Sequence, residues 1–285
     1  MRKLRRKKNK TQVTIVVCSA AVLLLIMTAG YAAFSTNITI TAKGNLKDLK
    51  TEVDKNVPTI GLLTWMQADN NDNTNTVLKD KSGNDNDAII YGATFTDDGL
   101  LFDGVDDYGI INNLDYNNSK AITIDFVSNI QKGSSDILFE SSSNYNENEM
   151  SYLINIDDFG TNSLEADVHA LNAPGSYNVN YVSNFLNYSK FSHYTVRFDT
   201  TKEYNNFIDI FLNGNKQSIT HRDNNTYNIS NNNFSNYPFY IGSRAGQHSF
   251  IHMIIKELII YNRALTDEEI QNLDNGYKKK YKLIS

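Results

Sequence analysis

From Ile60 to Tyr261 the chain consists of short apolar runs separated by turns rich in Asn, Asp, Gly and Ser. This rhythm is typical of an antiparallel β-sandwich rather than of βαβ units. The strands predicted from it are residues 62–68, 88–91, 100–102, 108–111, 121–130, 136–140, 151–156, 163–170, 193–199, 207–212, 216–220, 239–242 and 252–261.

Two of these runs decide the fold class. In residues 121–127, Ile122, Ile124 and Phe126 share one face while polar residues occupy the other, which predicts a half-buried strand. Residues 207–212 lead directly into Asn213-Gly214, the strongest signal for a two-residue hairpin because both turn positions need a positive φ. An all-β, two-sheet antiparallel jelly roll follows.

The C-terminal residues do not follow the two-residue alternation of apolar and polar positions that is typical of strands. Thr266 is followed three residues later by Glu269, the spacing of a capping box, and Leu265 and Ile270 can form a hydrophobic staple around it. These signals predict one short helix at 267–275 that ends at Gly276, followed by a basic tail at 276–285.

The N-terminal end is basic and then apolar. Seven basic side chains lie within residues 2–10, and residues 13–33 contain no charged residue. This pattern predicts a hydrophobic helix that is either a signal peptide or a retained membrane anchor, with the downstream domain outside the cytoplasm. The chain therefore divides into the export segment (1–33), a connector (34–59) with a short predicted strand at 36–42, the sandwich domain (60–275) and the basic tail.

Charge and cysteine usage narrow the classes of partner. The formal net charge is −5, and without the basic N-terminus the remainder carries about −12. An acidic body argues against nucleic acid as a partner. The single cysteine, Cys18, lies in the apolar segment, so the domain contains no disulfide.

Three segments carry a family resemblance: residues 80–87 (DKSGNDND), 102–108 (FDGVDDY) and 260–270 (IYNRALTDEEI). Together they resemble the bacterial laminin-G-like jelly rolls of the concanavalin A-like lectin/glucanase superfamily. The resemblance implies a β-sandwich that binds a glycan or an extracellular protein.

A second, shorter resemblance lies at the export segment. Residues 30–36 (GYAAFST) are similar to the processing site of the TasA-like class of biofilm-fibre proteins, which implies cleavage between Ala33 and Phe34. It also implies an extracellular or cell-surface location in a Gram-positive bacterium. If the segment is not cleaved, it anchors the protein in the membrane.

Carboxylates crowd two of the predicted turns. Asp85, Asp87, Asp103 and Asp106 are candidate ligands of a structural Ca²⁺, which takes 6 to 8 hard oxygen ligands. The alternative is that these residues form turns by bonding their own backbone.

Candidate chemistry elsewhere is sparse. Related glucanases use two acids on one strand, and the nearest match, residues 164–169 (LEADVH), has His169 in the place of the second acid. Trp65 lies on an alternating strand and is expected in the core. Tyrosines suit either sugar contacts or sheet packing: Tyr145, Tyr152, Tyr177, Tyr181, Tyr188 and Tyr237. The sequence therefore predicts a non-catalytic binding module, with a matrix or pilus-like structural component and a glycoside hydrolase as alternatives.

Overall fold

The computed structural model describes residues 55–283 apart from 113, 132–135, 145–147, 157–161, 170–176, 183–184, 187, 189, 204–205 and 224–230. The predicted N-terminal hydrophobic helix and the strand predicted at 36–42 lie outside the described residues. Within the described part of the chain, no helix combines the length and the apolar character needed to cross a membrane.

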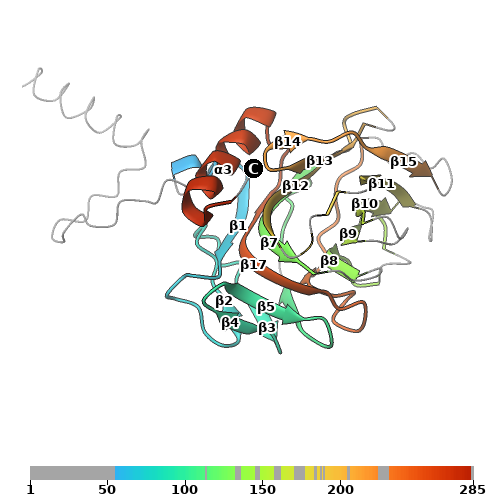
Figure 1. The fold of residues 1–285 in the computed structure, drawn as a ribbon. Coiled ribbons are helices and arrows are strands. Elements are labelled where there is room, and N and C mark those ends of the chain that lie inside the picture. The colour runs from blue at the N-terminus through green and yellow to red at the C-terminus, as the bar shows by residue number, and fades with distance from the viewer. Residues whose placement is uncertain are drawn as a thin grey trace, which may run out of the picture. The chain divides into compact units, whose positions relative to one another are not determined.

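Two antiparallel sheets, here called sheet A and sheet B, face each other and confirm the predicted sandwich (Figure 1). Among the described residues, sheet A has the order β14-β13-β12-β7-β17-β5-β4, and β1 pairs with β17 beyond the end of β5. Sheet B has the order β15-β11-β10-β9-β8-β16-β6-β3-β2.

The strands of sheet A are β1 (Leu62–Gln67), β4 (Thr94–Thr96), β5 (Gly99–Asp103), β7 (Ala121–Ile130), β12 (Phe191–Asp199), β13 (Ile208–Leu212), β14 (Asn215–Lys216) and β17 (His252–Tyr261). The strands of sheet B are β2 (Val77–Leu78), β3 (Ala88–Tyr91), β6 (Tyr108–Ile111), β8 (Asp136–Ser141), β9 (Tyr152–Ile156), β10 (Leu164–His169), β11 (Tyr177–Val182), β15 (Thr220–Asp223) and β16 (Phe239–Ile241).

The main core lies between the two sheets. Ile122, Ile124 and Phe126 of β7 are fully buried there, as their spacing predicts. The ring of Phe126 meets the ring of Phe139 on β8 with 4.9 Å between centroids, which places the two sheets in direct contact. Burial of each such side chain contributes about 1.5–3 kcal/mol to folding.

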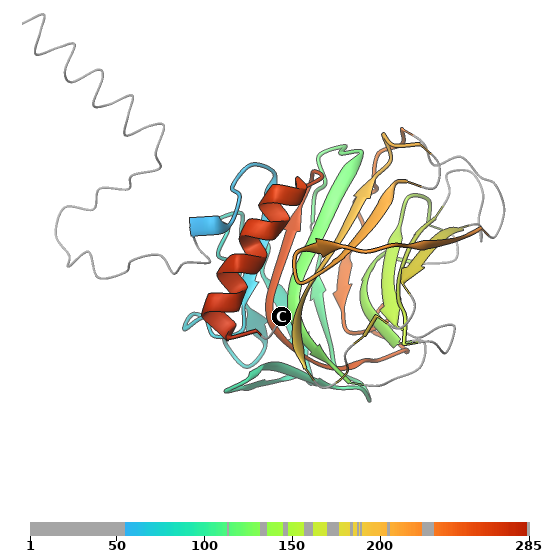
Figure 2. The ribbon, with the colours of Figure 1, turned by 45° about the horizontal axis from the view of Figure 1, so that its top comes forward.

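Sheet A is buried on its outer face as well, so the expectation of a half-buried β7 is wrong. Thr123 and Asp125 are both inaccessible to solvent. The cause is the helix α3 (Asp267–Tyr281), which lies against sheet A on the side away from sheet B (Figure 2). Leu273 and Tyr277 of α3 pack there in a second apolar cluster, which also contains Trp65, a core residue as predicted.

The helix begins as predicted and ends later than predicted. The capping box of Thr266 and Glu269 is formed, but α3 continues to Tyr281 rather than stopping at 275, so most of the predicted basic tail is helical. Gly276 does not end the helix, and it is buried together with Leu273 and Tyr277. Packing there outweighs the helix penalty of a glycine, about 1 kcal/mol.

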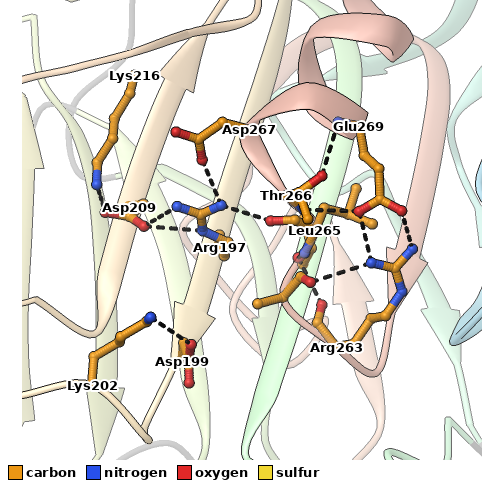
Figure 3. Close-up of polar contacts among 12 residues, drawn as sticks. Arg197, Asp199, Lys202, Asp209, Lys216, Arg263, Leu265, Thr266, Asp267 and Glu269 are labelled. Atoms are coloured by element: carbon orange, nitrogen blue, oxygen red, sulfur yellow. Dashed lines mark hydrogen bonds and ion pairs between the residues drawn. The ribbon is translucent and has the colours of Figure 1, made fainter.

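Two arginines fasten the start of α3 to the sandwich (Figure 3). Arg263, which follows β17, donates bonds of 2.8 and 2.7 Å to the two carboxylate oxygens of Glu269. Arg197 on β12 donates to Asp267 at 2.8 Å and to Asp209 on β13 at 3.0 Å. Such charge-assisted, paired bonds are among the stronger polar contacts in proteins, and they explain why the segment 260–270 closes the domain.

A buried polar network continues this contact. His193 of β12 lies between Asp125, 2.7 Å from Nε2, and Asp274 of α3, 3.2 Å from Nδ1, and Tyr277 donates its hydroxyl to Asp125 at 2.8 Å. Burial alone would lower the pKa of His193, but the bonds and charges of the two carboxylates outweigh it and raise the pKa to about 9. The imidazole is therefore cationic at neutral pH and lies between the two carboxylates, of which Asp274 also pairs with Lys278 at 2.6 Å.

Other departures from the predicted strands are local. The hairpin at Asn213-Gly214 is confirmed, with both residues at positive φ. The strand predicted at 216–220 is instead two strands: β14 closes the hairpin on sheet A, and β15 joins the edge of sheet B. Strands β2 and β4 were not predicted because two or three residues are too few to show alternation. Strand β11 was also missed, within an Asn- and Tyr-rich stretch.

Candidate functional site

One row of side chains crosses the outer face of sheet B. Residues that pair directly on neighbouring strands point to the same face of a sheet. From β3 through β6, β16, β8 and β9 to β10 the row is Ile89, Ile110, Tyr240, Glu140, Leu153 and Asp167. It therefore runs from an apolar end to an acidic end.

The first part of this face, here called the aromatic end, consists of Tyr91, Tyr108 and Tyr240. The rings of Tyr91 and Tyr108 stack across β3 and β6 with 4.6 Å between centroids. Tyr91 is 46% exposed and Ile89 is 39% exposed, which few large apolar side chains are in the part of the chain that the structure describes. Gly246 lies against the ring of Tyr108, where an added Cβ would be 2.9 Å from Cε2. The loop after β16 therefore packs beside the stacked tyrosine rings.

The second part, here called the polar end, is centred on Glu140 of β8. Its carboxylate is fully buried, receives a hydrogen bond from the hydroxyl of Ser142 and lies 3.6 Å from Nε of Arg244. The side chain of Arg244 is 28% exposed, so it connects the buried carboxylate to the surface. Burial raises the pKa of Glu140, although Ser142 and Arg244 oppose the change.

Strand β10 completes the polar end. Glu165, Asp167 and His169 alternate along it with core residues, so all three point to the outer face, and each is less than a tenth exposed. Ser163 donates its hydroxyl to Glu165 at 2.7 Å, and Asn155 of β9 donates to the same carboxylate at 3.4 Å. The strand predicted at 163–170 is thus confirmed as β10.

His169 differs from an acid in charge as well as in shape. Burial and the nearby charge of Arg244 lower its pKa to about 4, so the imidazole is neutral at neutral pH. A neutral imidazole cannot replace the second carboxyl group of a glucanase as a proton donor. Glu140 and Asp167 stand two strands apart, about 10 Å at the backbone, so strand spacing does not favour the separation of about 5 Å that a retaining pair requires.

Two kinds of group are accessible on this face. The ring of Tyr91 offers an apolar surface and the guanidinium of Arg244 offers a planar set of donors, whereas the carboxylates of the polar end are buried. The exposed groups of this face are therefore aromatic and cationic.

The carboxylates predicted to bind calcium separate into two places. Asp103 and Asp106 come together with Asp107, and one oxygen from each lies within 4.8 Å of the others. Asp85 and Asp87 do not belong to this group: Asp85 occupies a turn with φ of +59°, and Asp87 pairs with Lys79 at 2.5 Å.

The group of three aspartates lies in the turn that joins β5 of sheet A to β6 of sheet B. Asp107 is 6% exposed and accepts from the backbone N–H of Asp103 at 2.8 Å, while Asp103 accepts from the N–H of Val105 at 2.8 Å. Burial and the charges of Asp103 and Asp106 raise the pKa of Asp107. The remaining oxygens are hard donors that suit Ca²⁺, and a cation would relieve this repulsion.

The aromatic end was not predicted from the sequence. Of the tyrosines predicted to contact sugar or pack in the sheets, Tyr152 is fully buried in the core, and Tyr237 donates its hydroxyl to the carbonyl of Glu149 at 3.2 Å. Tyr145 lies outside the described residues. The available signal was β3, in which Ile89 and Tyr91 alternate with buried residues and so face outward.

Comparisons with known proteins agree with the β-sandwich fold. A laminin G family model described as the Concanavalin A-like lectin/glucanases superfamily matches residues 103–271. Comparison with curated protein sequences gives no match.

Among solved structures, the receptor binding domain of botulinum neurotoxin C/D mosaic serotype is similar, with a TM-score of 0.56 at 13% identity over 76% of this chain and 51% of that chain. A sialidase of Trypanosoma rangeli has a TM-score of 0.57 at 16% identity over 80% of this chain and 34% of that chain. The chain therefore spans about half of the toxin domain and about a third of the sialidase, and the likeness is one of fold. With more than half of its residues matched by the family model, the chain belongs to the concanavalin A-like lectin/glucanases superfamily.

Proposed function

We propose that this protein is a non-catalytic glycan-binding module that acts outside the cell, and that the outer face of sheet B is its binding surface. The observation that carries the proposal is the exposed stack of Tyr91 on Tyr108, on the same outer face as the partly exposed Arg244. The fold it shares with a toxin receptor binding domain and with sialidases supports a role in recognition.

The two ends of the face have different tasks in this proposal. A sugar ring lies on Tyr91, since aromatic faces and sugar C–H groups associate in water. Hydroxyl groups of the next sugar unit bond to Arg244, whose position is held by the buried Glu140. The ligand is therefore an oligosaccharide of at least two units.

A glycan array probed with the full chain tests the proposal. We expect selective retention of a few oligosaccharides with dissociation constants in the micromolar range. Tyr91→Ala and Arg244→Gln should each weaken binding by about tenfold, equivalent to about 1.4 kcal/mol. Ile60→Ala and Lys202→Met are matched controls, since both side chains are exposed and lie away from this face. Retention that is unaffected by Tyr91→Ala would contradict this placement.

A glycoside hydrolase is the second candidate function. A carboxyl group with a raised pKa, as Glu140 has, is the kind of group that serves as a general acid, and Glu165 on β10 points to the same face of sheet B. Assays on the polysaccharides retained by the array decide between the two: hydrolysis that disappears in Glu140→Gln or Glu165→Gln would replace our proposal with catalysis.

A structural component of an extracellular matrix or a pilus-like assembly is the third candidate, motivated by the alternating residues 36–42 in the sequence. Silence on the array together with concentration-dependent fibres in electron micrographs would favour it. Deletion of residues 36–42 should then abolish the fibres.

The location and the anchor are tested separately. We propose export through the segment 1–33 with cleavage between Ala33 and Phe34. N-terminal sequencing of the protein from culture medium and from membranes distinguishes cleavage from a retained anchor.

A further inference from the structure

The loop between β16 and β17 contains a tight turn, here called the 244–248 turn. Arg244 and His248 form an antiparallel pair, in which the backbone N–H of Arg244 donates to the carbonyl of His248 at 2.8 Å. The backbone N–H of Gln247 donates to the carbonyl of Arg244 at 2.9 Å and closes the turn. The loop is tied to β8, where the N–H of Gly242 donates to the carbonyl of Leu138 at 2.9 Å. The turn is therefore fixed to the middle of sheet B.

The tip of the turn is held in an unfavourable backbone conformation. Ala245 and Gly246 have φ of +49° and +67°, as the two central residues of a type I′ turn require. The same pattern occurs at Asn213-Gly214, with φ of +48° and +76°. Asparagine and glycine tolerate a positive φ, whereas the Cβ of alanine comes too close to a carbonyl oxygen there. Such strain persists where the surroundings fix the backbone, and it is common at ligand sites.

The turn lies against the aromatic end of the outer face of sheet B. An added Cβ on Gly246 would be 2.9 Å from Cε2 and 3.0 Å from Cζ of Tyr108, so this residue touches the ring. The same ring stacks on Tyr91 with 4.6 Å between centroids. Arg244 and His248 are each two residues from Gly246, a separation that spans at most about 7 Å. The 244–248 turn therefore connects the stacked tyrosines with Arg244.

Two exposed side chains of the turn offer hydrogen bonds to a ligand. Paired residues on antiparallel strands point to the same side, with about 4.5–5.5 Å between Cβ atoms. His248 therefore lies on the side of Arg244, which reaches the buried Glu140 of the outer face. Nδ1 of the exposed His248 ring bonds to the hydroxyl of Ser249 at 3.0 Å, which leaves Nε2 for a ligand. The amide of Gln247 is also exposed and offers both donors and an acceptor.

We propose that the 244–248 turn is the specificity-determining wall of the glycan surface. The sugar ring that stacks on Tyr91 places the hydroxyl groups of its edge against Gln247 and His248, which distinguish sugars that differ in the orientation of one hydroxyl. The wrong epimer leaves these polar groups without a partner and binds more weakly. The strained tip at Ala245 holds both side chains in position before the ligand binds. This role rests on the proposed glycan binding and adds selectivity between epimers to it.

A glycan array that contains epimeric pairs, with chains ending in glucose, galactose or mannose, tests the proposal. We expect the full chain to retain one member of a pair at least about fivefold more strongly than the other, which corresponds to one net hydrogen bond. When Gln247→Ala is combined with His248→Ala, the two members should be retained about equally. Tyr91→Ala should weaken both members alike and leave their ratio unchanged, because stacking does not depend on the orientation of one hydroxyl.

The second hairpin with this turn pattern supplies a matched control. Asn215 is an exposed residue beside Asn213-Gly214 on sheet A, and Asn215→Ala should leave the array pattern unchanged. Gln247 and His248 are exposed, so the double variant should change Tm by less than about 2 °C. This measurement separates a loss of selectivity from a loss of fold.

Variants of Ala245 test the role of the strained tip. Ala245→Asn keeps the positive φ with less strain, so it should raise Tm and keep the selectivity. Ala245→Pro fixes φ near −65° and opens the turn, so it should remove the selectivity as the double variant does. Selectivity that survives Ala245→Pro would show that the turn does not position the two side chains.

Each remaining outcome has a definite meaning. The same ratio between epimers in the full chain and in the double variant overturns the role of the turn and leaves the glycan surface in place. Equal retention of epimers by the full chain overturns it as well. A loss of all retention in a folded double variant makes the turn a source of affinity rather than of selectivity, which also overturns it. Retention of no glycan by the full chain contradicts the proposed function itself, and this role with it.

Discussion

The outer faces of the two sheets differ in what covers them. The outer face of sheet A is covered by α3, and its polar groups are buried and bonded to one another, as in the contact of His193 with Asp125 and Asp274. The outer face of sheet B keeps Tyr91 and Ile89 exposed and connects its buried carboxylates to the surface through Arg244. The same strand pattern therefore serves stability on one side and, on the other, leaves exposed the surface where we propose that a glycan binds.

Two buried histidines show this difference in their protonation. Carboxylates surround His193 of sheet A and raise its pKa to about 9, whereas burial and an arginine lower the pKa of His169 of sheet B to about 4. Both side chains are less than a twentieth exposed. Burial alone thus does not decide the charge of a histidine; the sign of its neighbours does.

The largest expected contrast comes from two tyrosine truncations. Tyr277→Ala removes a fully buried ring and its bond to Asp125, and should lower the free energy of unfolding by about 3–5 kcal/mol. Tyr91→Ala removes a ring that is 46% exposed and should lower it by less than about 1 kcal/mol. Urea denaturation of both variants measures the difference, and equal losses would show that the two faces are not distinguished by their role in stability.

The next contrast is in pH dependence. The pKa of His193 is 6.5 when unperturbed and about 9 in the folded protein. Its contribution to the free energy of unfolding is therefore present in full below pH 6.5 and is lost as the pH rises to 9. The free energy of unfolding should fall by about 3 kcal/mol over this range. Urea denaturation at each pH measures this loss, and the urea midpoint should decrease. His193→Gln should remove this dependence between pH 6.5 and 9.

His169 provides the control for that experiment. The pKa of His169 in the folded protein lies below the unperturbed value of 6.5. Its contribution to the free energy of unfolding is therefore present above pH 6.5 and is lost as the pH falls toward 4. His169→Gln should therefore leave the alkaline loss of stability intact. Imidazole NMR signals that titrate together near pH 6.5 would contradict the assigned surroundings of both residues.

A smaller effect is expected at the edge of the covered face. Thr266→Ala removes the side chain that caps α3 by accepting from the backbone N–H of Glu269, and should lower the free energy of unfolding by about 1 kcal/mol. Thr266→Ser keeps the acceptor and should cost less. A loss of several kcal/mol would mean that the capping box, rather than the packing of Tyr277, holds the helix on sheet A.

The smallest effect concerns the junction between the two sheets. We propose that Asp103, Asp106 and Asp107 bind Ca²⁺ weakly, and each 1 kcal/mol of binding should raise Tm by about 2–4 °C. Adding EGTA to a calcium-loaded sample should lower Tm, and Asp106→Asn should remove the difference. An unchanged Tm would leave these residues as turn formers only.

Much of the fold could be predicted from local patterns in the sequence. The alternation of Ile122, Ile124 and Phe126, the turn at Asn213-Gly214 and the capping box at Thr266 each depend on residues a few positions apart, and all three are confirmed. The extent of α3 could not be predicted, because a glycine often marks the end of a helix, whereas Gly276 is buried inside a helix that packs on sheet A.

The sequence by itself determined which side chains alternate along each strand, since a strand has a period of two whatever its neighbours are. Tertiary structure alone decided which strands are neighbours, and so which outward residues meet: Tyr91 with Tyr108, Glu140 with Arg244, and Lys256 with Tyr281 across a bulge. These contacts join positions separated by up to about a hundred residues, and their register depends on packing across both sheets, which a local pattern does not contain.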